Sequence, residues 1–242
     1  MAELSEKRQK TMASKTVLIT GANRGIGLEF AKHYVKEGWK VIASARNVDS
    51  ADELKALKPW KLVKIDTANE QTILDAAKEL EAVPIDLLLN NAGVLTSNGI
   101  KTTDKADLMR QFEINAVGPF LMTRAFLPNL KLAVADKGEA FVAQLTSRMG
   151  SIADNTSGAY YGYRASKTAL NMISTSLALD LKEEKIGVLL LHPGYVATEM
   201  TGNHGNIGPA ESAASLTKVI ANAKLEDSGK FMHAVEGVVL PW

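Results

Sequence analysis

Tyr163 and Lys167 carry the most informative chemistry in the sequence. They stand four positions apart in a segment whose apolar residues recur at helical spacing, so both side chains are expected on one helix face. A phenol titrates near pH ~10 in water and serves as an acid or base at neutral pH when a nearby positive charge favours the phenolate. Lys167 can supply that charge. The pair predicts a proton-transfer site, although a tyrosine and a lysine at this spacing also occur by chance on solvated helices.

A glycine-rich turn lies upstream, in the stretch Thr20-Gly-Ala-Asn-Arg-Gly-Ile-Gly27. Glycines at 21, 25 and 27 let the backbone turn sharply and approach a ligand, and the helix start offers unpaired N–H groups to a pyrophosphate. The order is Gly-x-x-x-Gly-x-Gly, and no Lys-Ser/Thr pair follows as a P-loop would require. The stretch predicts a dinucleotide phosphate site, with a turn needed only for strand–helix packing as the alternative.

Three further segments place polar residues where such a ligand would lie. Leu87-Leu-Leu-Asn-Asn-Ala-Gly93 and Leu145-Thr-Ser-Arg-Met-Gly150 each end a predicted strand, and the second puts Ser147 at the carboxyl edge, where open α/β sheets bind ligands. Asn115 precedes Pro119 in a long helical pattern. Each has a structural alternative: a strand-ending turn, an unremarkable serine, and an amide that satisfies backbone groups freed by a bend.

The pattern from Lys15 onward positions these residues. Short apolar runs alternate with longer amphipathic segments, which predicts a parallel sheet with crossover helices. The expected strands are 16–20, 40–44, 61–65, 85–90, 140–145 and 187–192, with a weaker one at 230–233; the expected helices are 25–37, 51–57, 70–80, 105–132, 163–183 and 210–222. Pro119 should kink or locally break the helix at 105–132, because proline removes one backbone donor.

These elements predict one α/β domain of the doubly wound, Rossmann type over residues 15–242. Its parallel sheet should have about seven strands with helices on both faces. No linker or internal repeat divides the chain. Residues 1–14 form a polar tail that is expected to be disordered.

Composition narrows the function. A net charge of +1 gives no field for nucleic acid or anionic membrane, and no segment approaches the ~18 unbroken apolar residues of a spanning helix. Without cysteine there is no thiolate or disulfide, and the four histidines lack metal-ligand spacing, so no metal site is expected. The first fifteen residues read as neither signal nor anchor. We therefore expect a cytoplasmic protein that acts on a small molecule.

Taken together, the motifs resemble the short-chain dehydrogenase/reductase family, in its single-domain form, from about Lys15 to Trp242. The family order is a Thr-Gly-x-x-x-Gly-x-Gly turn, an Asn-Asn-Ala-Gly strand end, a helical Asn, a Ser, a Tyr-x-x-x-Lys helix and a Pro-Gly, and the chain has each in that order. The segments near Glu226 and Leu240 are similar to the subgroup that contains Sniffer-type carbonyl reductases and the bacterial C-factor signalling protein.

The resemblance implies hydride transfer between a nicotinamide and an aldehyde, ketone or alcohol. It makes Tyr163 the acid or base and Ser147 the hydrogen-bond partner of the substrate oxygen. Lys167 would hold the nicotinamide ribose and lower the tyrosine pKa, and Asn115 would position a water in a proton relay. The cofactor-binding positions implied by the family are Gly21, Asn23, Arg24, Gly25, Ile26, Gly27, Arg46, Asp66, Thr67, Asn91, Ala92, Gly93, Tyr163, Lys167, Pro193, Gly194, Val196 and Thr198.

The cofactor is expected to be NADP(H) rather than NAD(H). An NAD site usually ends the second strand with a carboxylate for the ribose hydroxyls, whereas this strand ends in Arg46, and Arg24 adds a second cation. The alternative is that both arginines are solvated surface residues. Asp66 and Thr67 match the adenine-contacting position of the family.

Several features bear on the substrate and on assembly. Ser147 precedes Tyr163 by sixteen positions, so the intervening loop is slightly enlarged, and Tyr160 and Tyr161 within it are expected at the substrate site or as loop anchors. The glycine-containing segment 195–209 reads as a mobile loop or a plain surface loop. Many family members pair through the two long helices, so a homodimer or homotetramer is expected. The alternative function is a dinucleotide-sensing signalling protein of the C-factor type.

Overall fold

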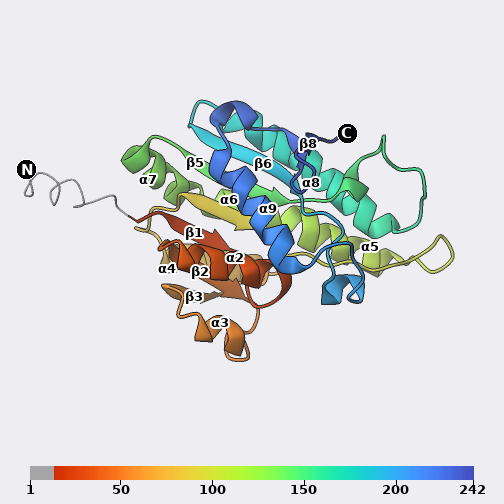
Figure 1. Cartoon of the computed structure of the whole chain (residues 1–242), viewed down its shortest axis with the longest axis horizontal. Helices are drawn as coiled ribbons and strands as arrows, with labels where there is room; N and C mark the ends of the chain where they lie inside the picture. Colours follow the sequence, from red (N-terminus) through yellow and green to blue (C-terminus); the bar gives the residue numbers. More distant parts are fainter. Residues whose placement is uncertain (1–13) are drawn as a thin grey trace, which may run out of the picture.

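An eight-stranded sheet runs through the computed structural model, which describes residues 14–242 (Figure 1). The strand order is β3-β2-β1-β4-β5-β6-β7-β8, and every neighbouring pair is parallel except β7 and β8. The strands are β1 (Thr16–Ile19), β2 (Lys40–Ala45), β3 (Lys61–Lys64), β4 (Leu87–Asn90), β5 (Ala140–Leu145), β6 (Ile186–His192), β7 (Phe231–His233) and β8 (Val238–Val239). The doubly wound α/β prediction is confirmed. The two-residue antiparallel β8 was not predicted, because its two valines are too short a run to signal a strand.

Helices cover both faces of this sheet. One face packs against α2 (Gly25–Lys36), α3 (Asp52–Ala56) and α9 (Pro209–Asn222). The other packs against α4 (Glu70–Glu79), α6 (Gly118–Ala125), α7 (Leu127–Lys137) and α8 (Tyr161–Asp180). Because both faces are buried, the strands are continuous apolar runs such as Val188 to Leu191, as expected for a parallel sheet.

The segment predicted as one long helix at 105–132, with a kink or local break at Pro119, consists of three α-helices and one π-helical turn. An α-helix, α5 (Lys105–Phe112), passes into a π-helical turn, η1 (Glu113–Val117), and then into α6. The wider turn lies just before Pro119, whose missing N–H would leave an α-helical carbonyl without its donor. A second break at Phe126, just before Pro128 in the first turn of α7, was missed, and α7 continues to Lys137.

The remaining boundaries differ by a few residues. Three short helical turns, η2 (Arg148–Gly150), η3 (Glu199–Thr201) and η4 (Leu225–Asp227), were not predicted because single turns carry no periodic signal. The expectation for the tail at 1–14 concerns residues that, apart from Ser14, lie outside the described part of the chain. Among the described helices, none is long and apolar enough to cross a membrane.

Candidate active site

The glycine-rich turn joins β1 to the start of α2 at the carboxyl edge of the sheet. Gly21 and Gly25 have φ of +63° and +54°, which glycine adopts without strain. A Cβ on Gly27 would collide with the carbonyl oxygen of Gly21. Arg24 stands at the N-cap without a side-chain cap, so the first N–H groups of α2 are left for a ligand. This cradle fits the pyrophosphate of a dinucleotide. Asn23 on the turn is exposed, and Ile26 on the first turn of α2 is partly buried.

Thr20 couples this turn to the end of β4. Its hydroxyl accepts hydrogen bonds from the backbone N–H groups of Asn91 and Ala92, each at 3.0 Å. The Asn91 side chain returns to the carbonyl oxygens of Thr20 at 2.9 Å and Gly21 at 3.1 Å. The two motifs therefore form one hydrogen-bonded unit. Thr20 was not among the predicted site residues. The available signal was a hydroxyl side chain that opens the motif just after a predicted strand.

The segment after β6 closes over the same edge. Thr198 lies against the glycine turn, since a Cβ on Gly25 would be 3.6 Å from its methyl group. Gly194 adopts φ +88°, and the carbonyl oxygen of Pro193 accepts a hydrogen bond from Ser212 on α9 at 2.8 Å. Val196 is buried and forms a β-bridge with Ile207. The segment 195–209 thus folds back on itself beside the turn.

Tyr163, Lys167 and Ser147 meet beside this unit. Tyr163 and Lys167 lie one turn apart on α8, and the Lys167 Nζ is 5.8 Å from the centre of the Tyr163 ring. The ammonium donates to the carbonyl oxygen of Leu145 at 2.7 Å. Ser147 follows β5, hydrogen-bonds Tyr163, and accepts from the N–H of Met149 at 3.1 Å. The residues predicted as catalytic therefore come together in space.

Burial sets the protonation of this pair. It raises the pKa of Tyr163, and the hydrogen bond with Ser147 lowers that pKa in part. Burial also lowers the pKa of Lys167 to about 8. Loss of water is the largest cause of the shift in the Tyr163 pKa and Lys167 is not among the causes, so the lowering of that pKa by Lys167 stays a prediction. A phenol with its ordinary pKa of ~10 is already protonated at neutral pH, and burial moves that pKa further from neutrality, so Tyr163 carries the proton that a donor requires.

Asn115 lies fully buried in the π-helical turn η1. Its Nδ2 donates to the carbonyl oxygen of Val94 at 2.8 Å and to the Ser166 hydroxyl at 3.0 Å, and its Oδ1 accepts from the Val94 N–H at 2.8 Å. A Cβ on Gly93 would lie 3.2 Å from that Oδ1 and 3.8 Å from the Lys167 Nζ. The Asn115 side chain therefore holds the backbone at Val94 beside Lys167. Both its amide oxygen and its amide nitrogen have hydrogen-bond partners within the protein.

The residues predicted to select the cofactor lie around the end of β2. The Ala22 N–H donates to the Ser44 carbonyl oxygen at 2.8 Å, which holds the glycine turn against this strand. Arg46 follows the strand and is exposed, and no carboxylate pairs with it among residues 14–242. Arg24 instead pairs with Glu199 on η3. Both arginines were predicted to bind the cofactor. Arg46 has no carboxylate partner among the described residues and can bind a phosphate, whereas Arg24 is already paired with Glu199.

Asp66 and Thr67 follow β3 on the same edge. The Asp66 carboxylate accepts from the Ala68 N–H at 3.1 Å and is partly exposed. Thr67 is buried, and a Cβ on Gly118 would lie 2.7 Å from its carbonyl oxygen. The glycine before Pro119 thus lets α6 pack against this loop.

Comparison with known proteins agrees with this geometry. The family model described as short chain dehydrogenase matches residues 15–206. The chain belongs to the short-chain dehydrogenase family. The 1-hydroxy-2-glutathionyl-2-methyl-3-butene dehydrogenase of Rhodococcus sp. (strain AD45) is 37% identical over 233 residues, 94% of this chain and 99% of that protein. The C-signal of Myxococcus xanthus is 42% identical over 160 residues, 66% of this chain and 93% of that protein.

Two solved structures of carbonyl reductases are also similar. The NADPH-bound carbonyl reductase from chicken fatty liver has a TM-score of 0.87 and 32% identity, covering 95% of this chain and 99% of that one. The carbonyl reductase Sniffer of D. melanogaster has a TM-score of 0.89 and 30% identity, covering 95% and 100%. The predicted resemblance to Sniffer-type reductases is confirmed, and C-signal matches the expected likeness to the bacterial C-factor.

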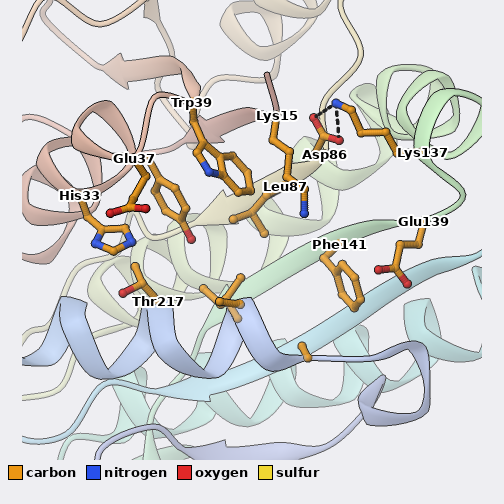
Figure 2. A pocket seen from close by; sticks show the side chains of 14 residues that line it. Lys15, His33, Glu37, Trp39, Asp86, Leu87, Lys137, Glu139, Phe141 and Thr217 are labelled. Atoms are coloured by element: carbon orange, nitrogen blue, oxygen red, sulfur yellow. Dashed lines mark hydrogen bonds and ion pairs between the residues drawn. The ribbon is translucent and has the colours of Figure 1, made fainter. Parts of the chain in front are cut away.

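In this short-chain dehydrogenase a hollow of about 290 Å³ lies at the opposite, amino edge of the sheet. Figure 2 shows Trp39, Leu87 and Phe141 around it, with the ion pair between Asp86 and Lys137 at one side. None of the predicted site residues lines this hollow. The family's motifs are gathered at the carboxyl edge instead.

The tyrosines before α8 differ from Tyr163. Tyr160 is the left-handed N-cap of α8, with φ +53°, and its backbone N–H donates to the Asn98 carbonyl oxygen at 2.9 Å. Tyr161 is 44% exposed on the first turn. The backbone of Tyr160 therefore ties the start of α8 to the segment at Asn98, and the two predicted roles of its side chain stay predictions.

Proposed function

We propose that this short-chain dehydrogenase is an NADPH-dependent carbonyl reductase that interconverts an aldehyde or ketone with its alcohol. The observation that carries the proposal is the meeting of buried Tyr163 with Ser147 and Lys167, beside a glycine cradle suited to a dinucleotide. The similarity to an NADPH-bound carbonyl reductase supports it. Residues 15–242 would act as one dinucleotide-binding domain.

The side chains would divide the work in a simple way. Bound NADPH supplies the hydride. Tyr163, which is protonated at neutral pH, would donate its proton to the substrate oxygen as negative charge develops there. Ser147 would hydrogen-bond the same oxygen and stabilise that charge. Lys167 would hold the nicotinamide ribose, and Asn115 would hold the chain at Val94 beside it.

The remaining predicted residues would hold the cofactor. The turn from Gly21 to Gly27 and the segment containing Thr198 would enclose the pyrophosphate, and Asp66 and Thr67 would contact the adenine. Arg46 would bind the 2′-phosphate that distinguishes NADPH from NADH, because it is exposed and lacks a carboxylate partner among the described residues.

The direct test is NADPH oxidation, followed by absorbance, with a panel of aldehydes, ketones and quinones. We expect turnover with several carbonyl compounds, with NADPH preferred over NADH. A protein that binds NADPH tightly and turns over no member of the panel would contradict the reductase proposal.

One observation favours a second function. The 42% identity to C-signal supports a signalling or regulatory protein that senses the dinucleotide. The intact Ser147, Tyr163 and Lys167 favour the enzyme, since a sensor has no chemical need for the phenol and hydroxyl. Binding of NADPH with no turnover would select the sensor.

The proposal extends to assembly and location. We propose a homodimer or homotetramer formed through α5 and α8, whose surfaces expose Met109, Phe112 and Met172. Light scattering that shows only monomer at micromolar concentration would contradict it. A cytoplasmic location is part of the proposal, because the reaction needs an intracellular supply of NADPH.

A further inference from the structure

The segment after β4 is fastened to α5 and η1 by three polar side chains at four-residue intervals. Asp107, Gln111 and Asn115 lie on one face of these helical turns and contact positions 94, 96 and 98 of the segment. Four residues along a helix and two residues along an extended chain both advance by about 6 Å, so the two segments stay in register. We call the three side chains the polar ladder.

Gln111 is the middle rung, and it is fully buried. Its Oε1 accepts from the Thr96 N–H at 3.1 Å, and its Nε2 donates to Asp107 Oδ2 at 2.8 Å. Every polar atom of the amide is therefore used in the ladder. A buried amide costs free energy unless it is bonded, so a packing role alone would be served better by an apolar side chain.

Asp107 is the outer rung. Its Oδ1 accepts from the Thr96 hydroxyl at 2.8 Å, and its Oδ2 accepts from Asn98 at 3.2 Å as well as from Gln111. The carboxylate thereby joins three donors from two elements. Asn115, the inner rung, grips both the N–H and the carbonyl of Val94.

The ladder reaches α8 and its N-cap at three points, one of which is the hydrogen bond from Asn115 Nδ2 to the Ser166 hydroxyl at 3.0 Å. The Asn98 carbonyl oxygen accepts from the Tyr160 N–H at 2.9 Å, at the left-handed cap of α8. Gly162 packs against Gln111 so closely that a Cβ there would lie 2.5 Å from Nε2. Tyr163 is the next residue. Movement of Gln111 would thus be passed to the helix turn that carries the proton donor.

We infer that Gln111 and Asp107 are positioning residues for the proposed carbonyl reduction, acting through the chain at 94–98 and the start of α8. The inference rests on the proposed function. It adds two residues to the site that neither touch the reacting atoms nor belong to the family motifs quoted above.

The first test replaces the middle rung by an apolar side chain of similar length, Gln111→Met. We expect kcat to fall roughly tenfold to hundredfold, because small misplacements of a catalytic group are costly, while the Kd for NADPH changes less than about twofold. The matched control is Gln71→Met on α4, since Gln71 also donates to an aspartate four residues away, Asp75, at 2.9 Å, but on the surface. This control should leave kcat unchanged.

The second test is a rescue experiment, which remains informative even if the Gln111→Met variant folds poorly. Gln111→Glu alone places a second carboxylate against Asp107 where an amide N–H now donates at 2.8 Å, so kcat should fall. The double variant Asp107→Asn/Gln111→Glu restores a donor facing an acceptor and keeps an acceptor for the Thr96 N–H. We expect it to recover at least tenfold in kcat over the weaker single variant. A double variant no better than either single one would overturn the inference.

Hydrogen exchange separates this inference from the proposed function. In Gln111→Met the Tyr160 amide, which Gln111 does not touch, should exchange at least tenfold faster, and amides of β6 should keep their protection. Unchanged exchange at Tyr160 would overturn the ladder even if the protein proves to be a reductase. Absence of turnover in the unmodified protein would overturn the reductase proposal, and the exchange result would still decide the ladder.

Discussion

The two edges of the sheet each hold a lysine and a buried tyrosine, but the lysines have different partners: a carboxylate at the amino edge and a neutral carbonyl at the carboxyl edge. At the amino edge, Lys137 Nζ lies 2.8 Å from Asp86 Oδ1 (Figure 2). Asp86 also accepts a hydrogen bond from the Thr16 N–H at 2.6 Å. At the carboxyl edge, Lys167 is 5% exposed and has a backbone carbonyl, Leu145, as its hydrogen-bond acceptor among the described residues.

The tyrosines differ in the same way. Tyr34, at the amino edge, packs against Trp39 with ring centres 4.8 Å apart, and burial raises its pKa. Tyr163 is also buried, but it hydrogen-bonds Ser147 and lies beside an ammonium. The ion pair at the amino edge neutralises a buried carboxylate, whereas Lys167 has one neutral carbonyl as its acceptor among the described residues and keeps donors for ligand hydroxyls such as those of a ribose. We therefore expect binding and chemistry at the carboxyl edge and a contribution to stability at the amino edge.

The largest expected effect comes from exchanging the two phenols for phenyl rings. Tyr163→Phe removes the proton donor and keeps the ring, so turnover should fall by at least ~10²–10⁴ while NADPH binding is nearly unchanged. Tyr34→Phe is the matched control at the amino edge and should leave kcat as it is. Steady-state rates and fluorescence titration with NADPH measure both quantities.

If Tyr163→Phe kept a tenth or more of the activity, another group would supply the proton. If Tyr34→Phe lowered kcat as much as Tyr163→Phe, the expectation that chemistry takes place only at the carboxyl edge would be wrong.

The buried ammonium at the carboxyl edge should make stability depend on pH. The Lys167 pKa is about 8 in the folded protein against 10.5 for an unperturbed lysine, so between these values the unfolded chain binds more protons than the folded one. Unfolding free energy should therefore rise with pH across this window, by about 3 kcal/mol from this residue, and the cost of burying the charge is fully present below pH 8.

Other groups also titrate there, so the measurement is a difference. Urea unfolding of the unmodified protein and of Lys167→Met at several pH values between 7.5 and 10.5 should show the variant's advantage shrinking as pH rises. A constant difference over that range would mean that Lys167 is not buried as a cation.

Much of the carboxyl edge was predictable because its residues occur in ordered motifs. The glycine turn, Ser147 and the Tyr163–Lys167 spacing each have a local signature, and the carboxyl ends of parallel strands meet at one edge. The alternation of apolar runs with amphipathic segments likewise predicted a doubly wound parallel sheet with helices on both faces.

The rest depended on contacts distant in sequence. The Arg24–Glu199 pair joins residues far apart in the chain and belongs to no motif. Gln111 could have been noticed as a polar residue four positions before Asn115, but only the fold shows that the chain at 94–98 lies along that face. The π-helical turn was missed because sequence shows a proline's missing donor and not which helical form absorbs it.

A third prediction sharpens the role of unpaired charge at the carboxyl edge. Arg46→Ala should weaken NADPH much more than NADH, because a charge-assisted hydrogen bond to the 2′-phosphate contributes about 1.5–3 kcal/mol, roughly a ten- to hundredfold preference. Arg24→Ala should have a smaller effect, since Glu199 already pairs with Arg24. Titrations of each dinucleotide at low and high salt measure the preference, which salt should reduce. Equal losses for both cofactors would make Arg46 a solvated surface residue.

The smallest effect is expected at the amino edge and concerns stability alone. Lys137→Met leaves the Asp86 carboxylate, whose side chain is 6% exposed, without its cation, and should lower the free energy of unfolding by about 1–2 kcal/mol. Lys131→Met on the same helix is the control: its pair with Glu184 is nearly half exposed on both sides, so its loss should stay within about 0.5 kcal/mol. Neither change should alter kcat or NADPH affinity. Denaturant unfolding and steady-state rates on the same preparations test both statements, and a Lys137→Met variant that kept its stability but lost turnover would reverse the assignment of the two edges.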